Sequence, residues 1–151
     1  MSFINIKGLS HKFNIKDKDG NKVGENWAVK DVDFLADKGE MIAILGRNGS
    51  GKSTFARHLN GLLAPHEGTV IIGGQDLSKV SVLSSIRRQV GMVFQNPDNQ
   101  IVGNTLAEDV GFGLENLGMS SADIWDQIDE MLELTGLAAY KYSNTSRISG
   151  G

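Results

Sequence analysis

The sequence predicts an α/β fold that begins with an antiparallel β subdomain, and three observations carry this prediction. Short, loosely alternating stretches indicate strands at 3–6, 9–15 and 27–36. Asp19-Gly20, which lies between polar flanks, is a strong hairpin-turn signal. The run MIAIL at 41–45 is apolar at every position, as expected of a strand that is buried on both faces of a parallel sheet.

The rest of the chain alternates between helix-like and strand-like segments, which is the pattern of an α/β core. Helices are expected at 53–62, 80–89, 105–117 and 121–135, and strands at 69–72 and 90–94. Ser120 and Asp123 resemble a capping box before the last helix, and Gly136 is a plausible C-cap. That helix has one apolar face, formed by Ile124, Ile128, Met131, Leu132 and Leu134.

Composition narrows the classes of partner. The chain has 151 residues, enough for one domain with its own core, and a net charge of -3. Nucleic-acid binding needs a basic face, so no nucleic-acid partner is expected. The lack of cysteine excludes disulfides and Cys-ligated metal sites. A membrane span needs about 20 apolar residues, far more than the run at 41–45, so a membrane role requires a partner that holds the chain there.

The segment GRNGSGKS at 46–53 matches the phosphate-loop pattern G-x-x-x-x-G-K-[ST]. Glycines let the backbone curl so that successive N–H groups face one anion, and the following helix adds its positive end. Lys52 can reach the β and γ phosphates of a nucleotide, and the Ser53 hydroxyl can ligate Mg²⁺. Further contacts are expected from Gly46, Arg47, Asn48, Gly49, Ser50, Gly51 and Thr54. The alternative is a plain glycine-rich turn, which the flanking strand and helix signals disfavour.

The segment VGMVFQNPDNQIVGNTLAEDVGFGLENLG at 90–118 resembles the Q-loop region of ATP-binding-cassette (ABC) ATPases. More narrowly, it resembles the energy-coupling-factor and cobalt/nickel-type transporter ATPases, in which QNPDNQ and the DV-FGLEN run are typical. The segment GLLAPHEGTVIIGG at 61–74 fits the same family. The likeness extends over almost the whole chain. It implies a P-loop NTPase fold of the ABC ATPase type.

The resemblance assigns roles to two further residues. Gln95 takes the place of the Q-loop glutamine, whose amide oxygen completes the Mg²⁺ shell and whose loop senses the transmembrane partner. The alternative for Gln95 is a polar residue that ends a strand. Phe13 falls where the family usually has an adenine-stacking tyrosine, and a phenyl ring can also stack. A core phenylalanine is the alternative for Phe13.

The last residues resemble the start of the family's LSGGQ signature. Ser149, Gly150 and Gly151 match it, with Ile148 in place of Leu. In the family this motif caps the γ-phosphate held by a second subunit, so the resemblance implies that hydrolysis needs a head-to-tail dimer.

The resemblance divides the chain into three parts. These are an antiparallel β subdomain at 1–40, a phosphate-loop core at 41–95, and a Q-loop and helical subdomain at 96–151 that ends in the signature. No segment matches Walker B, the catalytic Glu or the switch His, so the chain is interpreted as the N-terminal part of one ABC ATPase domain, truncated before Walker B. Residues 1–151 alone are therefore expected to be inactive and poorly folded. His11, His58 and His66 are expected to be surface or loop histidines.

The function implied by the resemblance is that of the ATP-binding subunit of an energy-coupling-factor-type transporter. Such a subunit couples the binding and hydrolysis of ATP, with Mg²⁺, to uptake of a vitamin or metal ion. The implied partners are a second ATPase subunit and integral membrane subunits, at the cytoplasmic face of the membrane. The surface around 96–104, with Ile101 and Val102, is expected to meet the membrane partner. The alternatives are nucleotide binding without turnover and a non-transport ABC ATPase, which the QNPDNQ match disfavours.

Overall fold

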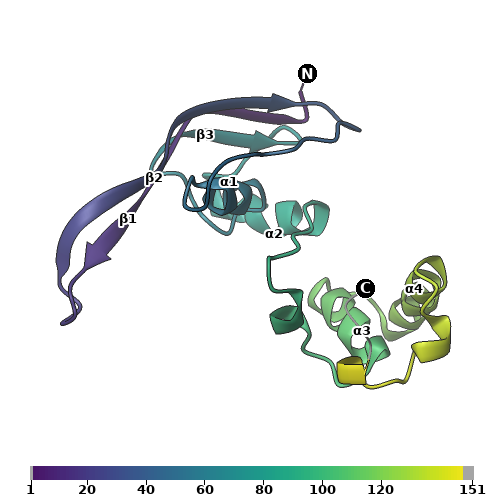
Figure 1. Cartoon of the computed structure of the whole chain (residues 1–151). Coiled ribbons are helices and arrows are strands. Elements are labelled where there is room, and N and C mark those ends of the chain that lie inside the picture. Colours follow the sequence, from purple (N-terminus) through teal and green to yellow (C-terminus); the bar gives the residue numbers. More distant parts are fainter. Residues whose placement is uncertain (1, 148–151) are drawn as a thin grey trace. The chain divides into compact units, whose positions relative to one another are not determined.

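The computed structural model describes residues 2–147. Contacts along the backbone divide the chain into two compact units, one that ends at Met92 and one that begins at Val93 (Figure 1). The first unit contains the sheet, the phosphate-loop segment and two helices, and the second is helical. No helix within residues 2–147 combines the length and the apolar character needed to cross a membrane.

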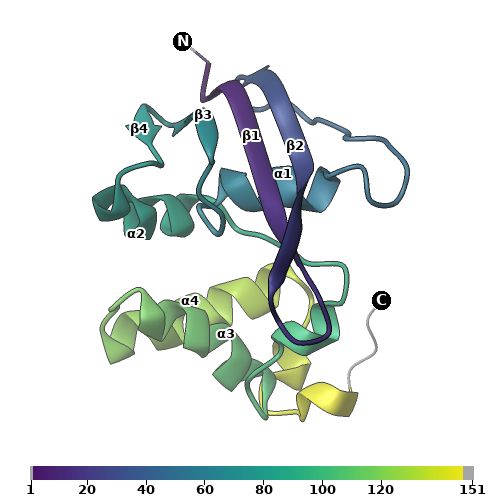
Figure 2. The same cartoon turned by 90° about the vertical axis from the view of Figure 1, so that its left-hand side faces the viewer.

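The first unit is built on a four-stranded sheet in the order β2-β1-β3-β4 (Figure 2). The strands are β1 (Ile4–Lys16), β2 (Lys22–Ala36), β3 (Glu67–Ile72) and β4 (Gln75–Asp76). All neighbouring pairs are antiparallel. The segments 3–6 and 9–15, expected as separate strands, form the single strand β1. The predicted antiparallel sheet therefore also includes β3, which the sequence had placed with the phosphate-loop core.

Two helices complete the first unit, α1 (Lys52–Leu59) and α2 (Val80–Gln89). Both were predicted from the sequence, and α2 has the predicted bounds. Helix α1 contacts β2 and β3 and covers one face of the sheet (Figures 1 and 2). The core between sheet and helices consists of Ile6, Leu9, Val29, Phe55, Val70, Ile72, Leu77 and Ile86. Each such buried aliphatic or aromatic side chain stabilises the fold by roughly 1.5–3 kcal/mol, so this core fixes α1 on the sheet.

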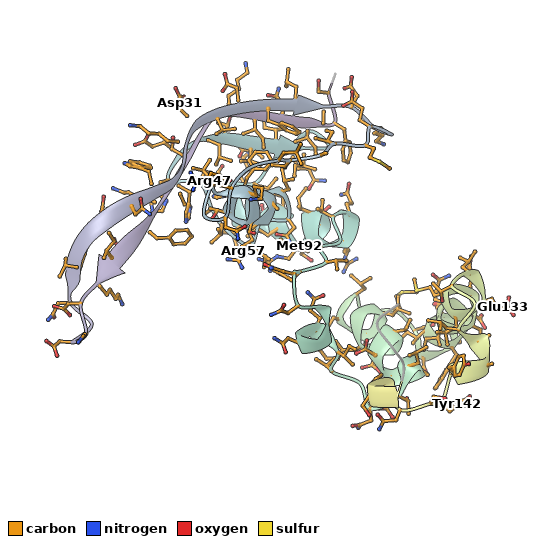
Figure 3. The ribbon with its side chains drawn as sticks, viewed as in Figure 1. Asp31, Arg47, Arg57, Met92, Glu133 and Tyr142 are labelled. Carbon is orange, nitrogen blue, oxygen red and sulfur yellow. The ribbon has the colours of Figure 1, made fainter. Side chains whose placement is uncertain are left out.

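The β1–β2 pairing has four register shifts, and the first two set which side chains face α1. The paired residues are Ile6 with Phe34, Leu9 with Val32, and His11 with Val29. An extra residue thus enters β1 near Gly8 (φ 58°) and another enters β2 near Asp31, which at φ 50° is the one non-glycine with positive φ in residues 2–147. A one-residue slip moves the following side chains to the other face. As a result, Leu9 and His11 lie on the buried face, whereas Asp31 projects from the opposite face (Figure 3).

Two predicted strands, at 41–45 and 90–94, are absent from the structure, and these predictions were wrong for residues 2–147. Neither segment has regular secondary structure. A strand needs a neighbour for its backbone N–H and C=O groups, and the described strands pair only with one another. Met41 and Leu45 are 99% and 90% exposed. Leu45 and Ile44 instead border an open pocket of about 490 Å³ beside β2.

The second unit is a pair of packed helices, α3 (Leu106–Asn116) and α4 (Ser121–Leu134). Three short 3₁₀ helices flank them, η1 (Pro97–Gln100), η2 (Ala138–Tyr140) and η3 (Thr145–Arg147). The small core between the helices contains Ala107, Leu114, Ile128 and Leu132. The predicted apolar face of α4 is correct at Ile128 and Leu132 and wrong at Met131 and Leu134, which are 40% and 79% exposed.

Local signals at the helix ends were predicted correctly. The Ser120 hydroxyl accepts the Asp123 backbone N–H at 3.3 Å, and it donates to the Asp123 carboxylate at 2.6 Å. Gly136, with φ 71°, follows the last turn of α4 and donates its N–H to the Glu133 carbonyl at 3.0 Å. Helix α3 begins with a full capping box, between Thr105 and Glu108. These bonds fix the ends of α3 and α4.

Candidate phosphate-binding site

The phosphate loop forms a tight turn that leads directly into α1. Gly49 and Gly51 have φ values of 82° and 89°, in the left-handed region that glycine adopts without strain. The Ser50 N–H donates to the Arg47 carbonyl at 3.1 Å, and the Phe55 N–H donates to the Gly51 carbonyl at 2.8 Å. Figure 3 marks Arg47 at this turn and Arg57 further along α1. The predicted loop and helix are therefore joined without an intervening linker.

Close contact with the sheet holds the loop in this position. A Cβ atom at Gly51 would lie 2.1 Å from the Ala28 carbonyl oxygen and 3.3 Å from the Val29 Cγ2 atom. A Cβ atom at Gly46 would lie 2.7 Å from the Ser50 Oγ atom. The contact at Gly51 is with backbone of β2, which cannot rotate away as a side chain can. Only glycine therefore fits at Gly51 without displacing the loop from the sheet.

The first turn of α1 is electrostatically suited to an anion. It contains no acidic residue, and its N-cap, Gly51, supplies no side-chain acceptor for the free N–H groups of the turn. Unpaired N–H groups and the aligned peptide dipoles give a helix N-terminus a partial positive charge. A phosphate group satisfies both, because its oxygens accept several N–H groups at once. The geometry of residues 46–53 thus fits the anion that the sequence motif predicts.

Lys52 rests across the loop. Its ammonium group donates to the Gly46 carbonyl at 2.8 Å and to the Arg47 carbonyl at 2.9 Å. These acceptors are two neutral carbonyl oxygens, and charged phosphate oxygens are stronger acceptors for an ammonium group. Lys52 can therefore exchange its loop partners for a ligand without leaving a buried charge unpaired.

The cradle also fits the magnesium ion that accompanies a nucleotide. Ser53 is exposed in the first turn of α1, beside the loop. Among residues 2–147 no group of three or more His, Cys, Asp or Glu residues is arranged to hold a metal ion. A single hydroxyl does not bind Mg²⁺ by itself, whereas Mg²⁺ commonly binds through a few protein oxygens together with phosphates. The donor set thus suits a metal that arrives with the nucleotide.

The predicted base-stacking residue, Phe13, lies on β1 beyond the bulge. Its side chain is 43% exposed, so it is not a core residue. Its ring packs edge-to-face on the His11 ring, with 4.7 Å between ring centroids. The exposed part of the ring is free to stack on a planar ligand, which is consistent with the predicted role.

Two histidines that were expected at the surface are buried. His11 is 6% exposed and His58 is 0% exposed, so the prediction was wrong for both, whereas His66 is exposed in a loop as predicted. His58 follows Phe55 by three residues on α1, a spacing that places both on the core face. His11 reaches the core face through the bulge in β1. The helical spacing could have predicted the burial of His58, whereas the bulge made the burial of His11 hard to predict.

The other predicted site residues lie outside the first unit or outside the described chain. Gln95 is an exposed residue in a bend near the start of the second unit, so its approach to a metal stays a prediction. Ser149, Gly150 and Gly151, together with Ile148, lie outside the described residues. The structure therefore brings together the loop, Lys52 and Ser53 in the first unit.

The fold and the loop define a phosphate-loop protein, and comparisons with known proteins place it more narrowly. The family model described as ABC transporter matches residues 29–151. The chain therefore belongs to the ABC transporter family. It is similar to the energy-coupling factor transporter ATP-binding protein EcfA1 of Lacticaseibacillus paracasei, with 52% identity over 82% of this chain and 44% of the relative. It is also similar to EcfA1 of Listeria monocytogenes, with 45% identity over 99% of this chain and 50% of the relative.

Solved structures confirm the ABC ATPase fold. The structure of cbiO1 from Clostridium perfringens, described as part of the ABC transporter complex cbiONQ, superposes with a TM-score of 0.77 at 30% identity. The match covers 98% of this chain and 56% of that one. The ATP-binding cassette MJ0796, bound to ADP and Pi, gives a TM-score of 0.78 at 27% identity over 97% and 63% of the two chains. The chain spans about half the length of the curated relatives it matches.

The contact between Gly51 and β2 leads to a prediction on stability. Gly51→Ala is expected to lower the free energy of unfolding by more than about 3 kcal/mol, because it adds a backbone clash to the strain of positive φ. Gly49→Ala is the matched control, since Gly49 has positive φ but no atom within 4 Å of the added Cβ, and its cost should be about 1 kcal/mol. Urea unfolding of the three proteins measures the difference, and equal losses would contradict the tight contact.

Proposed function

We propose that the protein containing this chain is the ATP-binding subunit of an energy-coupling-factor-type ABC transporter. The observation that carries the proposal is the phosphate loop, with its two left-handed glycines and a helix start free of acidic residues. The similarity to proteins named as energy-coupling factor transporter ATP-binding subunits supports the transporter type. In this proposal, residues 46–54 bind the phosphates of Mg-ATP.

Each part of the loop has its own task in binding. The backbone N–H groups of the loop and of the first turn of α1 donate hydrogen bonds to the phosphate oxygens. Lys52 leaves the Gly46 and Arg47 carbonyls and pairs with the terminal phosphates. The Ser53 hydroxyl and the Gln95 amide oxygen hold Mg²⁺, which neutralises charge that develops on the phosphates. Phe13 stacks on the adenine.

Turnover, in this proposal, belongs to an assembly of two ATPase subunits, of the same or different kind. The segment at 149–151 of one subunit meets the nucleotide that is held by the other. This arrangement makes hydrolysis depend on dimerisation. The assembly then couples hydrolysis to the uptake of a vitamin or metal ion through integral membrane subunits, and it lies at the cytoplasmic face of the membrane without crossing it.

The surface proposed to meet the membrane partner is the segment 96–104. Its two aliphatic side chains, Ile101 and Val102, are 45% and 59% exposed, as the sequence predicted. The Asp109 carboxylate accepts the N–H groups of Val102 and Gly103, at 2.8 and 3.0 Å. These bonds tie the segment to the first turn of α3, so its apolar side chains are displayed on a fixed backbone.

Lys52→Ala is expected to abolish nucleotide affinity, because it removes the one loop cation aimed at the β and γ phosphates. Titration with a fluorescent ATP analogue measures the change. Lys79→Ala, which removes the same charge just before α2, is the control and should bind normally. Unchanged affinity in the Lys52→Ala protein would refute the assignment of the loop.

A photo-reactive amino acid in place of Gln100 is expected to crosslink to an integral membrane subunit in the intact transporter. The physical reason is the apolar surface that Ile101 and Val102 expose beside this position. The same reagent at Lys18, in the β-hairpin turn of the first unit, is the control. Labelling confined to the second ATPase subunit would count against the proposed surface.

A further inference from the structure

Three imidazole rings from three segments meet beside the phosphate-loop helix. His58 lies on α1, His11 on β1 beyond the bulge, and His66 in the loop before β3. The His58 Nε2 atom and the His66 Nδ1 atom each lie 3.2 Å from the His11 Nδ1 atom. The Ala64 carbonyl oxygen lies 3.1 Å from the same nitrogen. His11, His58 and His66 together form the histidine cluster.

Carbonyl partners indicate which nitrogen carries the proton in two members of the histidine cluster, His58 and His11. The His58 Nδ1 atom lies 2.7 Å from the Thr54 carbonyl oxygen, which can only accept, so Nδ1 carries the His58 proton and Nε2 keeps its lone pair. By the same reasoning, the His11 Nδ1 atom carries a proton, because it faces the Ala64 carbonyl. The one Nδ1–H of His11 is thus shared between the Ala64 carbonyl and the lone pair of His58. A second proton, on the His58 Nε2 atom, would point at that N–H.

Burial and repulsion both keep the histidine cluster neutral. Burial is the main cause that lowers the pKa of His11 and of His58 below the ordinary 6.5, and hydrogen bonds to Ala64 and Thr54 only partly offset it. Repulsion from the neighbouring imidazoles lowers the pKa of both further. The charged residues adjacent to the cluster along its own segments are Lys12, Arg57 and Glu67. Of these, Lys12 directs its ammonium to the Glu25 carboxylate at 2.6 Å.

The histidine cluster connects the two parts of the proposed nucleotide site. At one end, His58 bonds to Thr54, which adjoins Ser53 in the first turn of α1. At the other end, the His11 ring packs edge-to-face on the His58 ring and on the Phe13 ring, with centroid distances of 4.8 and 4.7 Å. A continuous series of contacts therefore runs from the phosphate-loop helix to the proposed base-stacking ring.

We propose that His11 is a positioning residue of the nucleotide site: held by His58 and His66, it sets the Phe13 ring at the distance from the phosphate loop that a nucleotide base requires. This inference rests on the proposed function. It makes base recognition depend on the neutral cluster, because a proton added between His58 and His11 drives the two rings apart. Phe13, which is otherwise half-exposed, then loses its support.

The direction of the pH effect follows from proton linkage. A histidine with a lowered pKa in the folded state binds fewer protons when folded than when unfolded. Its contribution to stability is therefore complete above the unfolded-state pKa of 6.5 and is lost as the pH falls through the lower folded-state pKa. Binding of the base should weaken over the same range, at pH values below 6.5.

Two ligands separate base recognition from phosphate binding. ATP carries a base, whereas inorganic tripolyphosphate offers the same three phosphates without one. Both lose charge on the terminal phosphate near pH 6, so the ratio of their affinities largely cancels that effect. Isothermal titration of the protein, in the length that its gene encodes, gives this ratio at pH 7.5 and at pH 5.5. In the wild type, the preference for ATP is expected to fall by about tenfold at the lower pH, the order of one stacking contact.

Two variants test whether His11 acts by positioning Phe13. His11→Asn keeps a donor near the Nδ1 position but has no ring and does not titrate. Phe13→Leu leaves the histidine cluster intact, and its half-exposed site tolerates the change. Both should show the low ATP preference already at pH 7.5, without further change at pH 5.5. Thermal unfolding of Phe13→Leu should keep the wild-type dependence on pH, which separates positioning from a purely structural role.

Each contrary result has a distinct meaning. The positioning role is overturned if either variant prefers ATP as strongly as the wild type does. It is also overturned if the ATP preference of either variant falls between pH 7.5 and pH 5.5 as it does in the wild type. If the His11→Asn protein does not fold, the Phe13→Leu protein decides the question alone. Wild-type protein that binds neither ligand, or tripolyphosphate affinity that survives Lys52→Ala, would overturn the proposed function and this inference with it.

Discussion

The close approach of the Gly51 backbone to the Ala28 carbonyl is the constraint on which the site depends. A Cβ atom at Gly51 would lie 2.1 Å from that oxygen, so the loop meets β2 without a side chain between them. This contact determines where α1 starts on the sheet and where its free N–H groups point. The core residues Phe55 and Val29 then hold the helix there. An anion site at a helix start thus depends on one glycine and one strand.

The bulged hairpin brings a second element to the same side of the sheet. The extra residue near Gly8 transfers His11 and Phe13 to the face of β1 on which Ile6 and Leu9 are buried. In a regular hairpin, the alternation set by Ile6 would have turned both toward the opposite face. The bulge therefore positions the side chains of β1, as the contact at Gly51 positions the phosphate loop on β2. Together they place a phosphate cradle and an aromatic ring on two strands of one sheet.

The sequence predicted those features that depend on local signals. The loop motif, the helix α2 and the cap at Ser120 each follow from residues within a few positions of one another, and the structure contains all three. The prediction of strands at 41–45 and 90–94 was wrong because a strand depends on a distant partner as well as on its own apolar residues. The burial of His11 was missed because a bulge changes the face of every later residue in a strand. The roles of Gln95 and Phe13 came from family resemblance and stay predictions.

The central claim is that the backbone of the phosphate loop binds phosphate. Its most direct test is the amide NMR spectrum of ¹⁵N-labelled protein during titration with Mg-ATP, with residues 46–54 assigned. The account predicts large shifts of the amide signals of Gly49, Gly51 and Lys52, and small shifts in α2. Tripolyphosphate should reproduce the loop shifts without those at Phe13. Saturating Mg-ATP that leaves the glycine amides of the loop unmoved would contradict the account.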